Sequence, residues 1–438
     1  MTAELAQAVP PSRPAGRTAS AVLLWHAEAQ AGRRAGAFDP DSWCARFPDA
    51  AVLADYHRRG KQFVPPATLD LLDRVQPDLP PAGAGDAATV LAAFFDMALD
   101  KRRGRFDYHS YIGTELVGRG RTGDPRGFEH VLERQTSAVL LYLADLLGFE
   151  ARTFLGEEVR FGERVPRPAL VARRLRHTLE AMSHFGAELP PTLGAGVRAC
   201  LARHRIDAQT LRALSDFAAE RRAATDARSR RLCDLTMLPV SAVHDEYVFL
   251  RVLQLFEMVF EILVTGMRSC VDHAAGAPDR IPAFMLQMAD LLRRSIGFFR
   301  ILHTMPSENF AAFRVHTEGA SAIQSERFKY FELLTAHPPR ARVDSPAYTS
   351  VPRLATRYRD GLRNLEDALR GREISDSSRA AMTALDREYA RWKRIHYATA
   401  LKMIGDRSGT GGTPGIPYLA AAVDARLFPF LDASGARS

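Results

Sequence analysis

The stretch 243–267 reads VHDEYVFLRVLQLFEMVFEILVTGM and is the densest apolar segment of the chain. Its apolar residues return at steps of three and four, and five of them share one helix face: Val248, Val252, Leu255, Val259 and Leu263. Two acidic residues, Asp245 and Glu246, stand near the expected start, where they favour the positive end of the helix dipole. The pattern predicts a long helix buried inside a bundle.

The same periodicity recurs on both sides of this stretch. Amphipathic patterns separated by short polar breaks cover residues 128–147, 170–185, 208–231, 282–302, 322–334, 352–369 and 377–404. Alternating runs of β-branched residues with Asn-Gly or Asp-Gly turns, which are typical of strands, are essentially missing. We therefore predict an all-α fold built as a helical bundle.

The composition excludes several classes of protein. The net charge is +8, but the basic residues are spread along the chain and interleaved with acids, so the sequence does not predict nucleic-acid binding. No apolar run approaches the roughly 18–20 residues that span a bilayer, and the first 20 residues do not resemble a secretory signal. The four cysteines form no CxxC pair. We expect a cytoplasmic protein with reduced thiols and no membrane partner.

A second informative stretch is 391–419, RWKRIHYATALKMIGDRSGTGGTPGIPYL. A helix-compatible run carries His396, and Thr410 follows fourteen residues later within the glycine-rich string GTGGT. A histidine on a rigid helix beside a loop of little side-chain bulk suits an axial heme ligand with a lid that closes on a small substrate. A flexible linker is the alternative interpretation of such a glycine-rich string.

Two further groups of residues have both a structural and a functional interpretation. Arg314 follows the apolar residues 310–313, where an arginine is most often a surface residue whose stem covers apolar neighbours. Its planar guanidinium is also the group best matched to a carboxylate. Tyr108 and Tyr111, three residues apart, are compatible with ordinary packing on one helix face.

Together these motifs resemble the tryptophan 2,3-dioxygenase family, part of a wider superfamily of histidine-ligated, heme-dependent aromatic oxygenases. The similarity covers roughly residues 106–116 and 244–420, with four motifs in the family's order. The matching positions are the HDEYVF run 244–249 with Gln254 and Glu257, then Arg314, Ser321, Gln324, Ser325 and Glu332, then Trp392, His396, Ile404-Gly405, the GTGG loop and Tyr418-Leu419, with Tyr108 and Tyr111 near the N-terminus.

The resemblance implies heme b as the cofactor, with His396 as the axial ligand of the iron. It implies that Arg314 binds the carboxylate and Thr410 the ammonium group of an aromatic amino acid, and that Phe249 packs on its ring. Ser321, Tyr108 and Tyr111 complete the implied substrate-binding set: in the family the tyrosine segment reaches into the active site of a neighbouring subunit. A homo-oligomer, dimer or tetramer, is therefore also implied.

Two positions depart from the family pattern. Leu253 stands where the family has a distal histidine that hydrogen-bonds the indole N–H, and Phe310 replaces a tyrosine that helps to hold the carboxylate. Three explanations remain open for Leu253: a substrate altered on or near that nitrogen, a partner from elsewhere such as His109, or chemistry on a different ring. No catalytic residue is assigned, and His109 is retained as a candidate.

The spacing of the motifs gives a division of the chain. In the family only a short stretch separates the tyrosine segment from the HDE motif, whereas here 132 residues lie between Tyr111 and His244. We predict a disordered tail at 1–20, an N-terminal helical region at 21–119 that includes both tyrosines, an inserted helical subdomain at 120–240, and a heme- and substrate-binding core at 241–430.

The resemblance implies an oxidoreductase that uses dioxygen and an aromatic amino acid. Dioxygen insertion into the indole ring of tryptophan or a substituted tryptophan is the first hypothesis, in a specialised natural-product pathway. A heme-dependent hydroxylase of a tryptophan- or tyrosine-like amino acid is the second hypothesis. A heme protein that binds gas without turnover and a helical scaffold without heme are the remaining alternatives.

Overall fold

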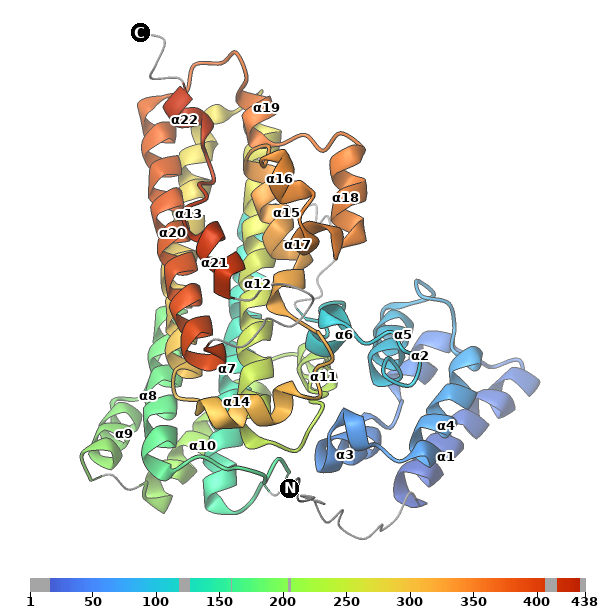
Figure 1. Ribbon diagram of the computed structural model, residues 1–438. Coiled ribbons are helices and arrows are strands. Elements are labelled where there is room, and N and C mark those ends of the chain that lie inside the picture. Colours follow the sequence, from blue (N-terminus) through green and yellow to red (C-terminus); the bar gives the residue numbers. More distant parts are fainter. Residues whose placement is uncertain (1–15, 118–126, 159, 204–205, 406–415, 434–438) are drawn as a thin grey trace, which may run out of the picture.

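The computed structural model describes residues 16–117, 127–158, 160–203, 206–405 and 416–433. All regular structure within these ranges is helical, and one isolated parallel bridge pairs Glu163 with Val243 (Figure 1). The prediction of an all-α fold is confirmed. Within the described ranges, no helix combines the length and the apolar character needed to cross a membrane.

Long helices that run side by side form the main body of the molecule (Figure 1). They are α7 (Phe128–Leu155), α8 (Pro168–His184), α12 (His244–His273), α13 (Ile281–Leu302) and α20 (Asp376–Ile404). The central α12 packs against α7, α13 and the shorter α15 (Glu326–Thr335), while α13 also packs against α8 and α20. Nearly all of α12 is buried, as the apolar stretch 243–267 predicted.

Shorter helices surround this body. The described ones are α6 (Tyr108–Ile112), α9 (Pro191–Arg203), α10 (Ala208–Ala223), α11 (Ala227–Leu235), α14 (Ser307–Arg314), α16 (Arg340–Val343), α17 (Pro346–Thr349), α18 (Pro352–Arg359), α19 (Leu365–Leu369), α21 (Ile416–Val423) and α22 (Phe430–Ala433). Four 3₁₀ turns join neighbouring elements: η1 (Lys61–Phe63), η2 (Gln76–Asp78), η3 (Pro278–Arg280) and η4 (Ala322–Gln324).

An N-terminal lobe has its own apolar core. It consists of α1 (Gly16–Arg34), α2 (Pro40–Ala45), α3 (Asp49–Arg59), α4 (Pro66–Val75) and α5 (Asp86–Ala98). The rings of Trp25 and Trp43 stack with centroids 4.0 Å apart, and each indole N–H donates to the other's carbonyl oxygen at 2.9 Å. Because α1 begins at Gly16, residues 16–20 are helical and do not form part of a disordered tail.

The segment predicted as an inserted subdomain shares the core of the main body. Buried residues of α7, α8 and α10 belong to the same apolar cluster as those of α12, α13 and α20. An amphipathic sequence shows that a helix buries one face, but it does not show which neighbour covers that face. The described helices α7, α8 and α10 are therefore part of the bundle in packing, and the origin of residues 120–240 as an insertion stays a prediction.

Buried ion pairs tie this segment to α12. Arg174 of α8 is fully buried and donates to Glu150 of α7 and, at 2.7 Å, to Asp245 of α12. Its Nε also donates to the Thr304 hydroxyl at 2.8 Å. Burial alone would raise the pKa of Glu150, but Arg174 and His244 hold it at about 2, so this carboxyl is ionised. The start of α12 is thus fixed by charge as well as by apolar packing.

Replacing the central arginine tests this arrangement. Arg174→Met keeps much of the side-chain volume but leaves the Glu150 and Asp245 carboxylates without their shared cation. Breaking a buried pair in this way typically costs about 3–5 kcal/mol of unfolding free energy. Urea denaturation measures the change. The neighbouring Arg173 is exposed, so the control Arg173→Met should stay within about 0.5 kcal/mol of wild type; equal losses in the two variants would contradict the ion-pair model.

Candidate active site

One pocket in the main body gathers most of the predicted site residues. Its lining comes from α6, α12, α13, α14, α15, α16, α20 and α21 and from the segment that joins α14 to α15. Eight of the ten residues predicted from the sequence lie in this lining: Tyr108, Tyr111, Phe249, Leu253, Phe310, Arg314, Ser321 and His396. Residues far apart in the chain, from Tyr108 to Ala422, therefore meet at one cavity.

The other two predicted residues do not join this group in the described structure. Thr410 and its glycine-rich string lie outside the described residues. His109 lies on α6 but not in the pocket lining, and its Nδ1 is 3.2 Å from the Thr114 hydroxyl. The structure therefore does not place His109 beside Leu253 as a substitute for the missing histidine.

His396 is held on the long helix α20, whose first turn is capped by Ser375. Its ring lies 5.2 Å from the Trp392 ring and 6.0 Å from the Phe299 ring, measured between centroids. Desolvation by this apolar surrounding lowers the pKa of His396 to about 4, so the imidazole is neutral at physiological pH. No hydrogen bond engages the ring within the described part of the chain.

These properties fit a heme group. A neutral imidazole without a hydrogen-bond partner among the described residues keeps a nitrogen lone pair available for iron. Four aromatic side chains add broad apolar surface to the pocket: Phe256, Phe260, Phe299 and Phe328. The buried Trp392 indole N–H also lacks a described partner. Planar apolar walls with one available imidazole are the donor set that a histidine-ligated porphyrin requires.

A second wall of the pocket is entirely apolar. Phe249, Phe310 and Phe313 form a mutual cluster with ring centroids 5.3–5.4 Å apart. Leu253 lies one helical turn after Phe249 on α12 and packs against the same apolar core. Neither Leu253 nor Phe310 can donate or accept a hydrogen bond. This wall is suited to the aromatic ring of a substrate rather than to its charged end.

Tyr108 and Tyr111 of α6 also line the pocket, although they lie far upstream in the sequence of its other lining residues. An Asp107–Ser110 capping box starts this short helix, and Gly113 ends it with a φ of 72°. The Tyr108 hydroxyl donates to Glu257 Oε1 at 2.8 Å, and the Tyr111 hydroxyl donates to Glu246 Oε1 at 3.1 Å. Burial, followed by these carboxylates, raises the pKa of both phenols well above the usual value. Both tyrosines line the pocket of their own chain.

Arg314 is the last residue of α14 and lies in the lining of the pocket. The Thr317 hydroxyl donates to the Arg314 carbonyl oxygen at 2.8 Å and fixes the end of this helix. Ser321 lies just before η4, where it forms a capping box with Gln324. The structure therefore brings two predicted substrate-binding residues, Arg314 and Ser321, to the pocket beside two consecutive local caps.

A group of charged residues for which no role was predicted also lines this pocket: Lys329 and Glu332 of α15, Arg342 of α16 and Lys393 of α20. Lys329 and Glu332 lie within the stretch that resembles the family, so a signal existed for them. Arg342 follows a proline pair in a stretch without a motif. Its place in the pocket depends on a long-range contact that the sequence does not show.

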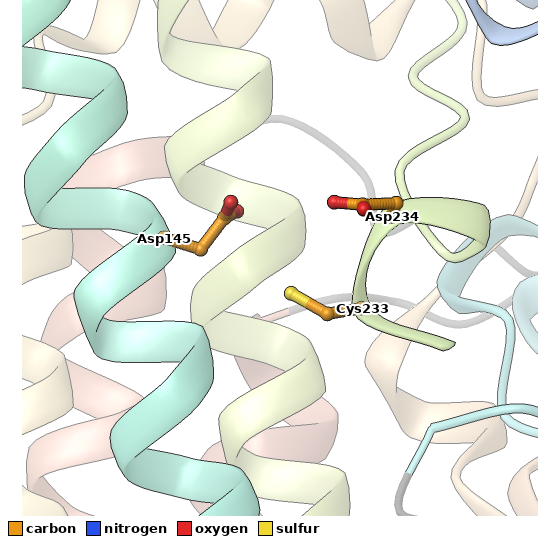
Figure 2. A group of neighbouring side chains, drawn as sticks. All are labelled: Asp145, Cys233 and Asp234. Carbon is orange, nitrogen blue, oxygen red and sulfur yellow. The ribbon is translucent and has the colours of Figure 1, made fainter. Parts of the chain in front are cut away.

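A separate cluster of Asp145, Cys233 and Asp234 has the residue types of a metal site. Figure 2 shows Asp145 of α7 facing the two residues of α11. Both carboxylates already serve arginines: Arg251 Nε donates to Asp145 at 2.7 Å, and Arg222 donates to Asp145 at 2.9 Å and to Asp234 at 2.8 Å. Burial raises the pKa of the Cys233 thiol. The cluster is an ion-pair network that joins α7, α10, α11 and α12.

Comparisons with known proteins support the resemblance. Three proteins named tryptophan 2,3-dioxygenase align with this chain: that of Burkholderia ambifaria (strain MC40-6) is 25% identical over 237 residues, covering 44% of this chain and 76% of the relative. That of Erythrobacter litoralis is 25% identical over 240 residues, covering 44% of this chain and 89% of the relative. That of Bradyrhizobium sp. (strain BTAi1) is 26% identical over 250 residues, covering 46% of this chain and 87% of the relative. No family model matches the chain. The chain is a distant relative of the tryptophan 2,3-dioxygenases.

Proposed function

We propose that this chain is a heme-dependent oxygenase of an aromatic amino acid. The observation that carries the proposal is the single pocket in which His396, Arg314 and a phenylalanine-rich wall meet. The relationship to proteins named tryptophan 2,3-dioxygenase supports the same class of oxidoreductase. Dioxygen insertion into the indole ring of tryptophan or a substituted tryptophan is the first candidate reaction.

His396 is the residue of this chain that would hold heme b, through a ring nitrogen kept neutral by burial. Heme, when bound, supplies the iron at which dioxygen is activated. The pocket phenylalanines would exclude water from the reacting ring. No described residue needs to act as acid or base in this scheme, because an electron-rich aromatic ring supplies its own electrons.

The substrate would be held at two places. Arg314 would bind the carboxylate with its planar guanidinium, and Phe249 would pack against the ring. Thr410, which lies outside the described residues, remains the proposed contact of the ammonium group. Fixing both ends of the amino acid replaces much of the entropy cost of bringing the ring to the reactive centre.

A heme-dependent hydroxylase of a tryptophan- or tyrosine-like amino acid is the second candidate. Leu253 favours it, because the side chain beside Phe249 offers no hydrogen-bond partner to an indole N–H. A carboxylate-binding arginine in the same pocket argues against a protein that only binds gas. The specialised pathway, the cytoplasmic location and the homo-oligomeric assembly stay predictions.

The heme ligand can be tested by substitution. His396→Ala removes the proposed iron ligand, so we expect the purified variant to lose stoichiometric heme and its Soret band. His337→Ala serves as the control, because His337 lies at the surface beside Asp367 and should leave the spectrum unchanged. Full heme content with an unaltered spectrum in His396→Ala would show that another residue ligates the iron.

The carboxylate contact can be tested by titration. Arg314→Leu keeps the bulk of the side-chain stem and removes the charge-assisted hydrogen bonds to the amino acid. We expect the binding free energy of the amino acid to weaken by about 1.5–3 kcal/mol, followed through the Soret spectrum. Arg300→Leu, on the exposed side of α13, is the control. A native-like affinity of Arg314→Leu for the amino acid would show that Arg314 does not bind the carboxylate.

The reaction itself can be read from labelled dioxygen. The holoenzyme is incubated with a panel of indolic and phenolic amino acids under ¹⁸O₂, and the masses of the products are measured by mass spectrometry. Two labelled atoms in one product identify ring dioxygenation, and one labelled atom identifies hydroxylation. Absence of turnover across the whole panel would contradict the oxygenase proposal and favour gas binding.

A further inference from the structure

Glu332 is the carboxylate of a charged cluster in the wall of the pocket, and its hydrogen-bonding capacity is fully used. Arg342 donates to both of its oxygens at 2.6 Å. The Tyr348 hydroxyl donates to Oε2 at 3.0 Å, and the Tyr389 hydroxyl donates to Oε1. Burial would raise the pKa of this carboxyl, but Arg342 and the hydrogen bonds hold it below the usual value. Glu332 and Arg342 therefore neutralise each other.

Lys393, on α20, also has its partners within the chain. Its ammonium group donates to the carbonyl oxygens of Ala422, at 2.9 Å, and Ala425. These bonds tie α20 to the chain at and after α21. The carbonyl oxygens satisfy N–H groups of Lys393, and the carboxylates of Glu332, Asp386 and Asp424 lie near enough to act on its charge.

Lys329 differs from both neighbours. It lies on α15, is 3% exposed and lines the pocket, yet its Nζ has no hydrogen-bond partner among the described residues. Its Nζ lies 5.9 Å from the centroid of the Tyr348 ring, which is only a loose contact. Burying a polar group without a partner costs roughly 1–3 kcal/mol, and an ammonium group costs more. Burial lowers the pKa of Lys329 to about 7, which reflects this cost.

We propose that Lys329 binds a carboxylate of a molecule held in the pocket. Among the charged groups of this wall, Glu332, Arg342 and Lys393 have partners, whereas no described residue accepts a hydrogen bond from the Lys329 ammonium group, so an anion is the complement that it lacks. The inference rests on the proposed function, because it concerns the same pocket. It adds a second anion-binding position to the one at Arg314.

The two positions lie on different parts of the bundle. Arg314 belongs to α14, which crosses the lower end of the bundle in Figure 1, whereas α15 and α16 lie higher along α12 and α20. One carboxylate cannot serve both positions if the amino acid is bound at Arg314. The chemistry leaves two sources for the second carboxylate: a propionate of the heme, or an additional acidic group on the substrate.

Two variants separate a binding role from a structural one. Lys329→Met keeps the length of the side chain without its charge, and Lys329→Arg keeps the charge. Since Lys329 makes no hydrogen bond to the described chain, Lys329→Met should leave the stability of the heme-free protein equal to or higher than that of wild type in urea. A clear loss of stability would show that the lysine supports the fold and would overturn the proposal.

Heme release identifies a propionate as the source. The proteins are loaded with heme or with heme dimethyl ester, which lacks the propionate charges, and release to an excess of apomyoglobin is followed by absorbance. We expect Lys329→Met to release heme about tenfold to a hundredfold faster than wild type. Release of the ester should be the same in both proteins, and Lys329→Arg should behave like wild type with heme.

Amino-acid binding identifies the substrate as the source. In that case heme release is unchanged in Lys329→Met, while the affinity for a ring-carboxylated tryptophan falls about tenfold to a hundredfold and that for tryptophan does not. Unchanged heme release together with unchanged affinity for both amino acids would overturn the proposal. Failure of the wild-type protein to bind heme would instead contradict the proposed function, and the amino-acid arm, followed by calorimetry, would still test Lys329.

Discussion

The burial of charge on α12 is the constraint on which the rest of the structure depends. Asp245, Glu246, Arg251 and Glu257 are at most 1% exposed, although they lie on a helix that is otherwise strongly apolar. A buried charge without a partner costs several kcal/mol. Each of these residues therefore fixes the position of whichever segment supplies its partner, and the partners come from most of the surrounding elements. Arg174 of α8 serves Asp245, and Asp145 of α7 serves Arg251.

The same constraint shapes the pocket. The Glu246 carboxylate accepts hydrogen bonds from two backbone N–H groups and from the Ser241 hydroxyl. The Tyr111 hydroxyl adds a fourth hydrogen bond to the same carboxylate. Glu257 accepts from Tyr108 and pairs with Arg327 at 3.4 Å. The short helix α6 is thereby held against α12 by its two hydroxyls. Hydrogen bonds to buried carboxylates of α12 thus hold tyrosines from far upstream in the chain at the pocket.

Helix content could be predicted from the sequence because it depends on local periodicity, whereas the residues of the candidate site were predicted from the resemblance of several motifs to one family. Periodicity placed a helix at 377–404, and α20 spans Asp376–Ile404. Residues within motifs, such as Arg314 and His396, keep their relative positions because helices and caps fix them locally. Packing partners are harder to predict from the sequence. Residues 120–240 carry helical patterns, but these patterns do not show that helices of this segment share the core of the bundle. The contact between Arg342 and Glu332 and the absence of His109 from the pocket lining are three-dimensional facts of the same kind.

The polar groups of the pocket are unevenly distributed, and this limits the ligands that suit it. The wall of Phe249, Leu253, Phe310 and Phe313 offers no hydrogen bond, so a ring N–H facing it would lose a bond to water without replacement, at roughly 1–3 kcal/mol. The opposite situation holds at Lys329, whose ammonium group finds no acceptor in the part of the chain that the structure describes. A molecule that matched both regions would present an apolar ring to the first and an anion to the second. Leu253 and Phe310 therefore leave this wall without polar contacts, while basic side chains line other parts of the same pocket.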